Sequence, residues 1–306
     1  MALSDEVRDE LASIAPRREC CRLAELSALF HTAGAVHFLG RGEVSVHLDV
    51  SSNAVARRAF SLLREFGVDS EIRTYRRRAF DRKTRYQLHV VGGGRALQVL
   101  HEAGVLTSTL APLDRPPKRV VGRSCCRSAY LRGALLGGGS VTGPRAPHLE
   151  LRASGRPGAE FIVAVAAAEG VALRAVERRG HAYAYAKGAE AIGDALAAAG
   201  ASDAVLAFQE RVVMGDAKAR ANRLANADHA NLVRAGRAAH VQLEAVRRLV
   251  DQGRLDELSP PLREVAELRL EHPSLSLREL ALECRPPVTK ASAHRRMTAL
   301  IRLAER

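Results

Sequence analysis

Hydrophobic and polar residues alternate in several short segments of the first two hundred positions, which is the pattern of antiparallel strands with one buried face. The clearest segment is 43–50, where every second residue is apolar. One face of that segment would carry Val44, Val46, Leu48 and Val50, and the other Glu43, Ser45, His47 and Asp49. Residues 36–39 precede it across Gly40-Arg41-Gly42, so the two segments are predicted to form a β-hairpin.

The spacing of apolar residues predicts helices between such hairpins. The first copy is expected to run as helix 22–32, hairpin 36–50, helix 54–66, hairpin 71–91 and helix 95–102. Asn53 is the expected N-cap of the helix over 54–66, and Gly67 is its expected stop. A second copy begins with an apolar helix that runs into Gly137-Gly138-Gly139. It continues as strand 148–153, helix 159–169, strands 172–178 and 182–186, and helix 189–199. The predicted fold class is α+β, with an αββαββα unit present twice.

A direct repeat in the sequence supports the two copies. Cys20-Cys21-Arg22 and Cys125-Cys126-Arg127 lie 105 positions apart, and further identities follow at the same offset. They are Ala24/Ala129, Leu26/Leu131, Gly34/Gly139 and Val36/Val141. An internal duplication usually means two copies of one supersecondary unit packed together. The predicted organisation is an N-terminal helix in 1–19, a first repeat at 20–124 and a second repeat at 125–212.

From residue 213 onward the strand pattern is absent, which predicts a separate all-α domain at 213–306. A polar helix over 222–231 is expected to run into 240–252, and another helix over 262–271 follows Ser259-Pro260-Pro261. A third helix spans 277–283, with Ser276 as its expected N-cap, and ends at the break Cys284-Arg285-Pro286-Pro287. A terminal helix begins at about Thr289. A helix, a short break and a second helix that is basic in its first turns form the pattern of a helix-turn-helix.

The candidate DNA contacts lie in this helix pair. Arginine can fork onto guanine or hold a phosphate, and a helix N-terminus adds backbone donors for phosphate. The residues expected to face the groove and the phosphates are Ser276, Thr289, Lys290, Ser292, His294, Arg295 and Arg296. The alternative interpretation is a basic surface helix of an ordinary helical bundle.

The charge of the chain agrees with a polyanionic partner. The 47 basic residues exceed the 34 acidic ones, which gives a net charge of +13 and favours nucleic acid. A genome of high GC content, in which arginine is simply frequent, is the alternative. Aromatic residues make up 4% and tryptophan is absent, which disfavours a stacking platform for single strands. Secondary phosphate contacts are predicted on the second hairpin of the first repeat, at Arg73, Arg77, Lys83 and Arg85.

The sequence lacks the motifs of several enzyme classes. It has neither an HExxH zinc motif nor a GxxxxGK[ST] phosphate loop, so no cofactor, bound metal or small-molecule substrate is predicted. The acidic N-terminal stretch MALSDEVRDEL does not resemble a signal peptide, and no apolar run is long enough for a bilayer, so no membrane association is expected. The chain is expected to be cytoplasmic and nucleoid-associated, with reduced cysteines. The paired cysteines are interpreted as small buried residues, with reactive helix-start thiolates as the alternative.

Two helices rich in small residues, each followed by a hairpin, resemble the LAGLIDADG homing-endonuclease fold. The last acid of each motif helix in that family binds the divalent metal for phosphodiester hydrolysis. The matching positions here are Ala33 and Gly138, which offer no carboxylate oxygen to a hard cation. The resemblance therefore predicts a scaffold that has kept its helix pair and has lost catalysis.

Taken in order, the motifs SDEVRDEL, the two CCR segments, NRLANADHANL and LSLRELA…PPVTKASAHRR resemble the WhiA family of bacterial regulators over nearly the whole chain. The resemblance implies a degenerate LAGLIDADG-like domain joined to a helix-turn-helix similar to region four of sigma factors. It implies a sequence-specific transcriptional regulator of sporulation or cell-division genes, with a part in chromosome segregation. Double-stranded DNA, RNA polymerase and a WhiB-type iron–sulfur co-regulator are the implied partners. The chain departs from the family pattern at Ala227 and at His294-Arg295, and the second departure leaves the target sequence open.

Two other functions are compatible with the sequence. One is an interaction scaffold for the division machinery, with incidental DNA binding. The other is a metal-dependent DNA endonuclease with displaced ligands, such as Glu25 or Glu43. The absence of matched acids in the two repeats disfavours the endonuclease.

Overall fold

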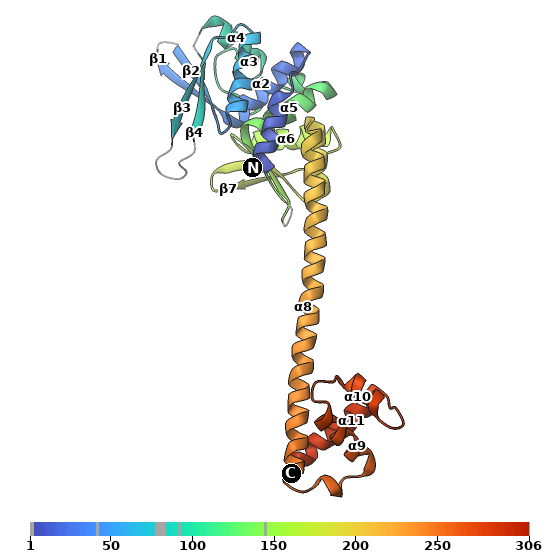
Figure 1. The fold of residues 1–306 in the computed structure, drawn as a ribbon. Coiled ribbons are helices and arrows are strands. Elements are labelled where there is room, and N and C mark those ends of the chain that lie inside the picture. The colour runs from blue at the N-terminus through green and yellow to red at the C-terminus, as the bar shows by residue number, and fades with distance from the viewer. Residues whose placement is uncertain (1–2, 41–42, 77–83, 91–92, 144–145, 306) are drawn as a thin grey trace. The chain divides into compact units, whose positions relative to one another are not determined.

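The computed structural model describes residues 3–40, 43–76, 84–90, 93–143 and 146–305 (Figure 1). The chain forms two compact units, Met1–Asp216 and Ala217–Arg306. The boundary falls within one helix, α8 (Ser202–Asp251). Each unit has its own hydrophobic core.

The first unit contains the predicted αββαββα order twice, after an N-terminal helix α1 (Leu3–Ser13). The first repeat consists of α2 (Glu19–Ala33), β1 (Gly34–Gly40), β2 (Glu43–Val50), α3 (Asn53–Glu65), β3 (Ser70–Arg76), β4 (Thr84–Val90) and α4 (Gly94–Glu102). A 3-10 turn η1 (Lys118–Val121) leads to the second repeat: α5 (Ser124–Gly138), β5 (Gly139–Thr142), β6 (His148–Ala153), α6 (Arg156–Ala167), β7 (Arg174–Arg178), β8 (His181–Lys187) and α7 (Ala189–Ala199). The predicted fold class is confirmed.

Each repeat builds a four-stranded antiparallel sheet with the same topology. The strand orders are β1-β2-β4-β3 and β5-β6-β8-β7. In each sheet the second strands of the two hairpins are neighbours in the middle, β2 with β4 and β6 with β8. Leu48 lies opposite Leu88 in the first sheet, and Leu151 lies opposite Ala184 in the second. The predicted alternation of β2 is confirmed, because Val44, Val46, Leu48 and Val50 are all buried.

The two sheets are joined by α2 and α5, which lie side by side at the centre of the unit (Figure 1). Small residues allow the backbones of the two helices to approach closely. A Cβ atom added at Gly133 would overlap the carbonyl oxygen of Glu25 and lie 2.8 Å from the Cβ of Ala28. The same holds near the other end, where a Cβ at Gly137 would overlap the hydroxyl of Thr32. The predicted helix-to-helix joint is therefore present.

One predicted capping residue is wrong. Ser52, and not Asn53, caps α3, since the Ser52 hydroxyl accepts a hydrogen bond from the Ala54 amide at 3.2 Å. Asn53 is the first helical residue. The two polar residues are adjacent and both types are good N-caps, so residue preference alone does not choose between them.

The second unit consists of the C-terminal part of α8, a 3-10 turn η2 (Leu255–Glu257), and the helices α9 (Pro260–Glu271), α10 (Leu277–Glu283) and α11 (Lys290–Ala304). Helix α9 begins two residues before the predicted Leu262, because proline is well accommodated in the first turn of a helix. The core of the second unit is formed by apolar residues from all four helices, among them Val246, Leu249, Val265, Leu280, Met297 and Leu300.

Candidate nucleic-acid interface

Helices α10 and α11 each begin at an N-cap side chain, Ser276 and Thr289, at the positions where the sequence predicts the helix starts. The Ser276 hydroxyl accepts from the Glu279 amide at 3.3 Å, and the Glu279 carboxylate accepts from the Ser276 amide at 2.8 Å, which completes a capping box. These bonds lower the pKa of the Glu279 carboxyl. At α11 the Thr289 hydroxyl accepts from the Ser292 amide at 3.2 Å. Both hydroxyls therefore support the helix starts, and the two helices are held on either side of a short turn.

The exposed face of α11 carries the basic residues of its first turns. Thr289, Lys290, His294 and Arg295 are exposed. Lys290 and His294 are four residues apart and so share one face of the helix. The opposite face is buried in the core of the second unit through Ala293, Met297, Leu300 and Ala304. The domain thus presents a basic helix face and keeps an apolar one, as a recognition helix requires.

Arg296 is turned toward the body of the domain. It is half-buried, and its Nη1 lies 3.3 Å from Oε2 of Glu264 on α9. The other oxygen of Glu264 accepts from the Arg285 amide at 2.6 Å. This carboxylate therefore connects α9, the turn and α11, and Arg296 serves the packing of the helix pair. Ser292 is also half-buried.

A cleft of about 460 Å³ lies beside the start of α10, between that helix and α8. Arg234, Arg278 and Lys290 line it together with the buried Arg269. The Arg269 guanidinium donates to the carbonyl oxygen of Leu275 at 2.6 Å and to the Gln242 amide oxygen at 2.8 Å, so it fixes the loop before α10 against α8. Sequence reasoning missed this arginine, because nothing in a local pattern distinguishes it from its exposed neighbours.

In the first unit, the degenerate metal positions lie in a groove of about 500 Å³ at the C-terminal ends of α2 and α5. Ala33 and Gly138 both line it. A Cβ atom at Gly138 would lie 2.8 Å from the carbonyl oxygen of Arg152 and 3.2 Å from the Cβ of Thr32. The position therefore lacks the acid and also lacks the space for any side chain.

The charge of this groove is the reverse of that of a metal site. Arg8, Arg85 and Arg152 line it with two histidines, whereas Asp49 is the acidic residue among the described lining residues. Asp49 accepts a hydrogen bond from the Tyr75 hydroxyl at 2.9 Å and lies 3.2 Å from Nε2 of His47. Such surroundings attract an anion such as phosphate and repel a divalent cation.

His31 forms part of the floor of the groove. Its Nδ1 lies 2.8 Å from the Ser27 carbonyl oxygen, and since a carbonyl only accepts, Nδ1 carries the proton. Burial lowers the pKa of this imidazole below its ordinary value, so the ring is neutral at physiological pH.

Glu25, one of the two displaced acids considered for a nuclease, is held by arginines and does not supply a metal site. Glu25 is fully buried, where its two oxygens each lie 2.8 Å from an arginine Nε, of Arg58 and of Arg132. It is also eight residues from Ala33 along α2, roughly 12 Å at the helical rise. The side chain of Glu43 lies outside the described part of the chain.

The structure describes two of the four residues predicted to make secondary phosphate contacts. Arg73 is exposed on β3 and pairs with Glu71 at 2.8 Å, and Arg85 lines the groove. These two arginines thus lie in different surroundings. Arg77 and Lys83 lie outside the described residues.

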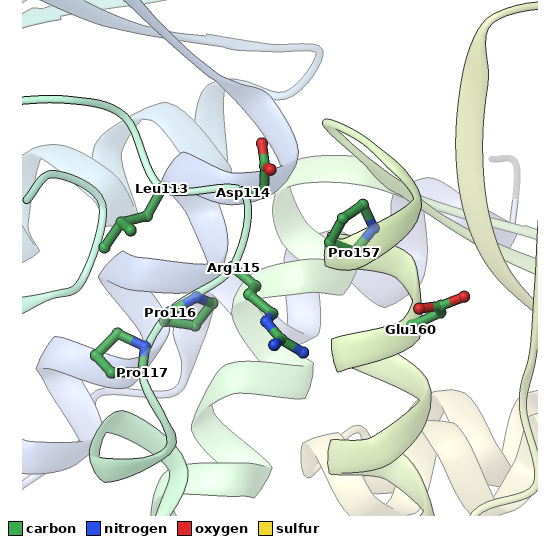
Figure 2. Close-up of a pocket in the computed structure, with 7 residues that line it drawn as sticks. All are labelled: Leu113, Asp114, Arg115, Pro116, Pro117, Pro157 and Glu160. Carbon is green, nitrogen blue, oxygen red and sulfur yellow. The ribbon is translucent and has the colours of Figure 1, made fainter.

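Another hollow of about 600 Å³ lies between the loop over 113–117 and the start of α6 (Figure 2). Three prolines form much of its wall, at positions 116, 117 and 157. The acids Asp114 and Glu160 point in different directions there (Figure 2). Among the described helices, none combines the length and the apolar character that crossing a membrane requires.

The fold and the groove define a class of protein: a duplicated LAGLIDADG-like scaffold without paired acids at its motif helices, followed by a helix-turn-helix domain. The chain belongs to the WhiA family. The WhiA N-terminal LAGLIDADG-like domain matches residues 19–106, the WhiA LAGLIDADG-like domain matches 127–218, and the WhiA C-terminal HTH domain matches 221–304.

Relatives match over the full length. The probable cell division protein WhiA of Symbiobacterium thermophilum is 37% identical over 309 residues, which cover 100% of this chain and 98% of that protein. The protein of the same name from Streptomyces avermitilis is 35% identical, with 100% and 93% covered. The crystal structure of full-length DUF199/WhiA from Thermotoga maritima has the same fold, with a TM-score of 0.58 at 21% identity and coverage of 100% and 98%.

Proposed function

We propose that this chain is a DNA-binding regulator of cell division, in which α11 contacts double-stranded DNA. The observation that carries the proposal is the exposed basic face of α11, opposite a buried apolar face, in a domain that matches the WhiA C-terminal HTH domain. The relatives named as cell division proteins support the process. Sequence-specific control of sporulation or division genes, with a part in chromosome segregation, is the finer form of the proposal.

The test begins with genome-wide DNA occupancy of the full chain, followed by affinity measurements on an enriched site. Arg295→Ala and Lys290→Ala are expected to weaken binding at least five-fold, because each removes a cation that faces the duplex. Arg302→Ala is the matched control, since it removes an exposed arginine from the last turn of the same helix. Equal losses for Arg295→Ala and Arg302→Ala, or no enriched sequence, would count against the proposal.

We propose further that the scaffold does not cleave DNA. Gly138 leaves no room for a side chain, and the groove gathers arginines where a nuclease gathers carboxylates. Supercoiled plasmid is expected to stay intact with Mg²⁺ or Mn²⁺. Nicking that survives repurification and disappears on Asp49→Asn would show that the groove retains catalysis.

The second candidate is an interaction scaffold for the division machinery. It is favoured by the large apolar side chains that α8 exposes in the second unit, such as Leu224 and Leu232, which are 65% and 72% exposed. If Leu224→Ser with Leu232→Ser leaves DNA affinity unchanged but abolishes the division phenotype, this candidate is the better one. RNA polymerase and a WhiB-type iron–sulfur co-regulator stay expectations from the family resemblance.

A further inference from the structure

The four cysteines of the two CCR segments come together at one point of the first unit. Cys20 and Cys21 lie in the first turn of α2, and Cys125 and Cys126 lie in the first turn of α5. Their Sγ atoms all lie within 4.8 Å of one another. The Sγ atoms of Cys125 and Cys126 are 4.0 Å apart. The duplication therefore produces a cluster of four thiols, although the two pairs are 105 residues apart in the chain.

The separations of the thiols suit a single metal ion. A tetrahedral ion with metal–sulfur bonds of about 2.3 Å holds its sulfur atoms roughly 3.8 Å apart. Even if every separation were at the observed limit of 4.8 Å, each sulfur would have to move inward by only roughly 0.6 Å to reach that distance. Cysteine side chains make such shifts by small rotations about χ1. A polynuclear iron–sulfur cluster, in contrast, holds its cysteine thiolates farther apart than a single ion does.

Positively charged groups lie around the cluster. The N-termini of α2 and α5 both begin at the cluster, and each contributes a partial positive charge. Nη1 of Arg18 lies 3.7 Å from Sγ of Cys125. A surface hollow lined by Arg18, Glu19, Cys20, Leu23 and Arg123 gives access from solvent. Four thiolates with one divalent cation carry a net negative charge. The two arginines and the two helix N-termini offset part of that charge, whereas the carboxylate of Glu19 adds to it.

Two of the thiols are protonated when no cation holds them. Burial raises the pKa of Cys21 to about 12 and that of Cys126 to about 11. The pKa of Cys125 is lowered, chiefly because the Cys21 thiol donates a hydrogen bond to the Cys125 sulfur, with a smaller contribution from Arg18. A metal cation displaces such protons, because the thiolate is the form that coordinates.

We propose that Cys20, Cys21, Cys125 and Cys126 form a structural site for a single thiophilic divalent cation, and that Zn²⁺ is the ion which this donor set selects. Four sulfur donors leave no open position for a substrate, so the site is not catalytic. It lies at the N-terminal ends of α2 and α5, whereas the arginine-lined groove lies at their C-terminal ends. The ion holds the two repeats together where their central helices begin.

The test uses the full chain, purified under reducing conditions and freed of metal with a chelator. One equivalent of Zn²⁺ is expected to bind and to raise the melting temperature in proportion to the logarithm of free Zn²⁺, since a ligand of the folded state stabilises it by mass action. Co²⁺ is the spectroscopic probe. It is expected to give the visible bands of a tetrahedral ion and a near-ultraviolet thiolate-to-cobalt band, and Zn²⁺ is expected to remove both.

Two variants separate the cluster from other thiols. Cys20→Ser with Cys125→Ser changes the two half-buried members and is expected to weaken Co²⁺ and Zn²⁺ binding at least ten-fold. Cys284→Ser is the matched control, a lone buried cysteine in the second unit, and is expected to bind as the unchanged chain does. The cobalt spectrum of the unchanged chain decides the question even if the double variant fails to fold.

Three outcomes would overturn the proposal. The first is the absence of a thiolate-to-cobalt band at micromolar Co²⁺ in the reduced chain. The second is an iron–sulfur absorption spectrum in the protein as isolated, which would replace the single ion by a cluster. The third is the isolation of disulfides between the two cysteine pairs together with no metal binding after reduction, which would make the cluster a redox pair.

Discussion

A single contact explains why α5 carries no acid at its end, and a second one shows what the acid inside α2 does. Gly138 faces the backbone of Arg152 and the side chain of Thr32 so closely that a Cβ does not fit. Glu25, the acid that α2 does contain, is enclosed by Arg58 and Arg132. A buried charge held by two partners is costly to disturb, about 3–5 kcal/mol when one partner is lost. Both residues therefore serve the joint between the repeats.

Gly138→Ala is expected to destabilise the first unit by about 1–3 kcal/mol, because the added methyl group overpacks a closed contact. Gly193→Ala in α7 is the control, since a Cβ there has nothing within 4 Å. That change is expected to be neutral or to stabilise by about 0.5–1 kcal/mol through helix propensity. Denaturant unfolding of the two variants measures the difference, and a Gly138→Ala variant as stable as Gly193→Ala would refute the steric argument.

His31 predicts a pH dependence of stability. Burial depresses the pKa of the folded form below the ordinary value of 6.5, so the unfolded chain binds the proton first as the pH falls. The contribution of His31 to the free energy of unfolding is therefore complete above about pH 6.5 and decreases below it. His31→Asn is expected to flatten the profile below about pH 6.5. A variant whose profile follows that of the unchanged chain would assign the effect to another group.

At the scale of elements, the helix pair of the second unit depends on caps as much as on its apolar core. The box between Ser276 and Glu279 sets the first residue of α10, and Thr289 sets that of α11. Arg269 and Glu264 then fix the loops on either side, through carbonyl and amide groups that would otherwise be left to solvent. The direction in which α11 leaves the turn thus follows from hydrogen bonds made by the two caps, Arg269 and Glu264.

Ser276→Ala is expected to destabilise the second unit by about 1 kcal/mol, the usual cost of losing an N-cap hydroxyl. Ser274→Ala, two residues earlier and also exposed, is the control. Urea unfolding followed by circular dichroism measures both changes. If the two variants lose the same stability, the capping box does not set the start of α10.

At the scale of the whole molecule, two units with separate cores divide the basic residues between them. The second unit exposes cations along the first turns of α11, whereas the first unit gathers Arg8, Arg85 and Arg152 in its groove beside Asp49. We expect the second unit to supply most of the phosphate contacts, because the acid in the groove opposes them and the exposed face of α11 has no acid beside Lys290, His294 and Arg295.

The measurement is affinity for an enriched site against salt concentration, for the full chain and for residues 217–306. Each phosphate contact contributes about one to the slope of log affinity on log salt. The isolated second unit is expected to keep more than half of the full-length slope, and Arg152→Ala in the full chain to change it by less than Arg295→Ala does. A slope below half would make the scaffold the principal DNA-binding surface.

The sequence alone determined what depends on neighbours along the chain. Alternation in 43–50 defined a buried strand face, helical spacing and glycines defined the order αββαββα twice, and Ser276 and Thr289 marked helix starts. These features follow from the periods of helix and strand and from hydrogen bonds that span three or four residues. The duplication was also visible, because two CCR segments at one offset require no structure to detect.

The tertiary structure alone decided which distant side chains meet. The cysteine pairs have no metal-binding spacing within either segment, and they become a four-thiol cluster only because α2 and α5 begin at the same place. Arg296 lies beside Glu264 of another helix, a pairing that the sequence does not show, while its contact with DNA stays a prediction. The three arginines of the groove come from α1, β4 and β6. Local periodicity sets the direction of a side chain from its own element, but helix packing and strand pairing set what lies opposite, and that physical difference separates the two kinds of result.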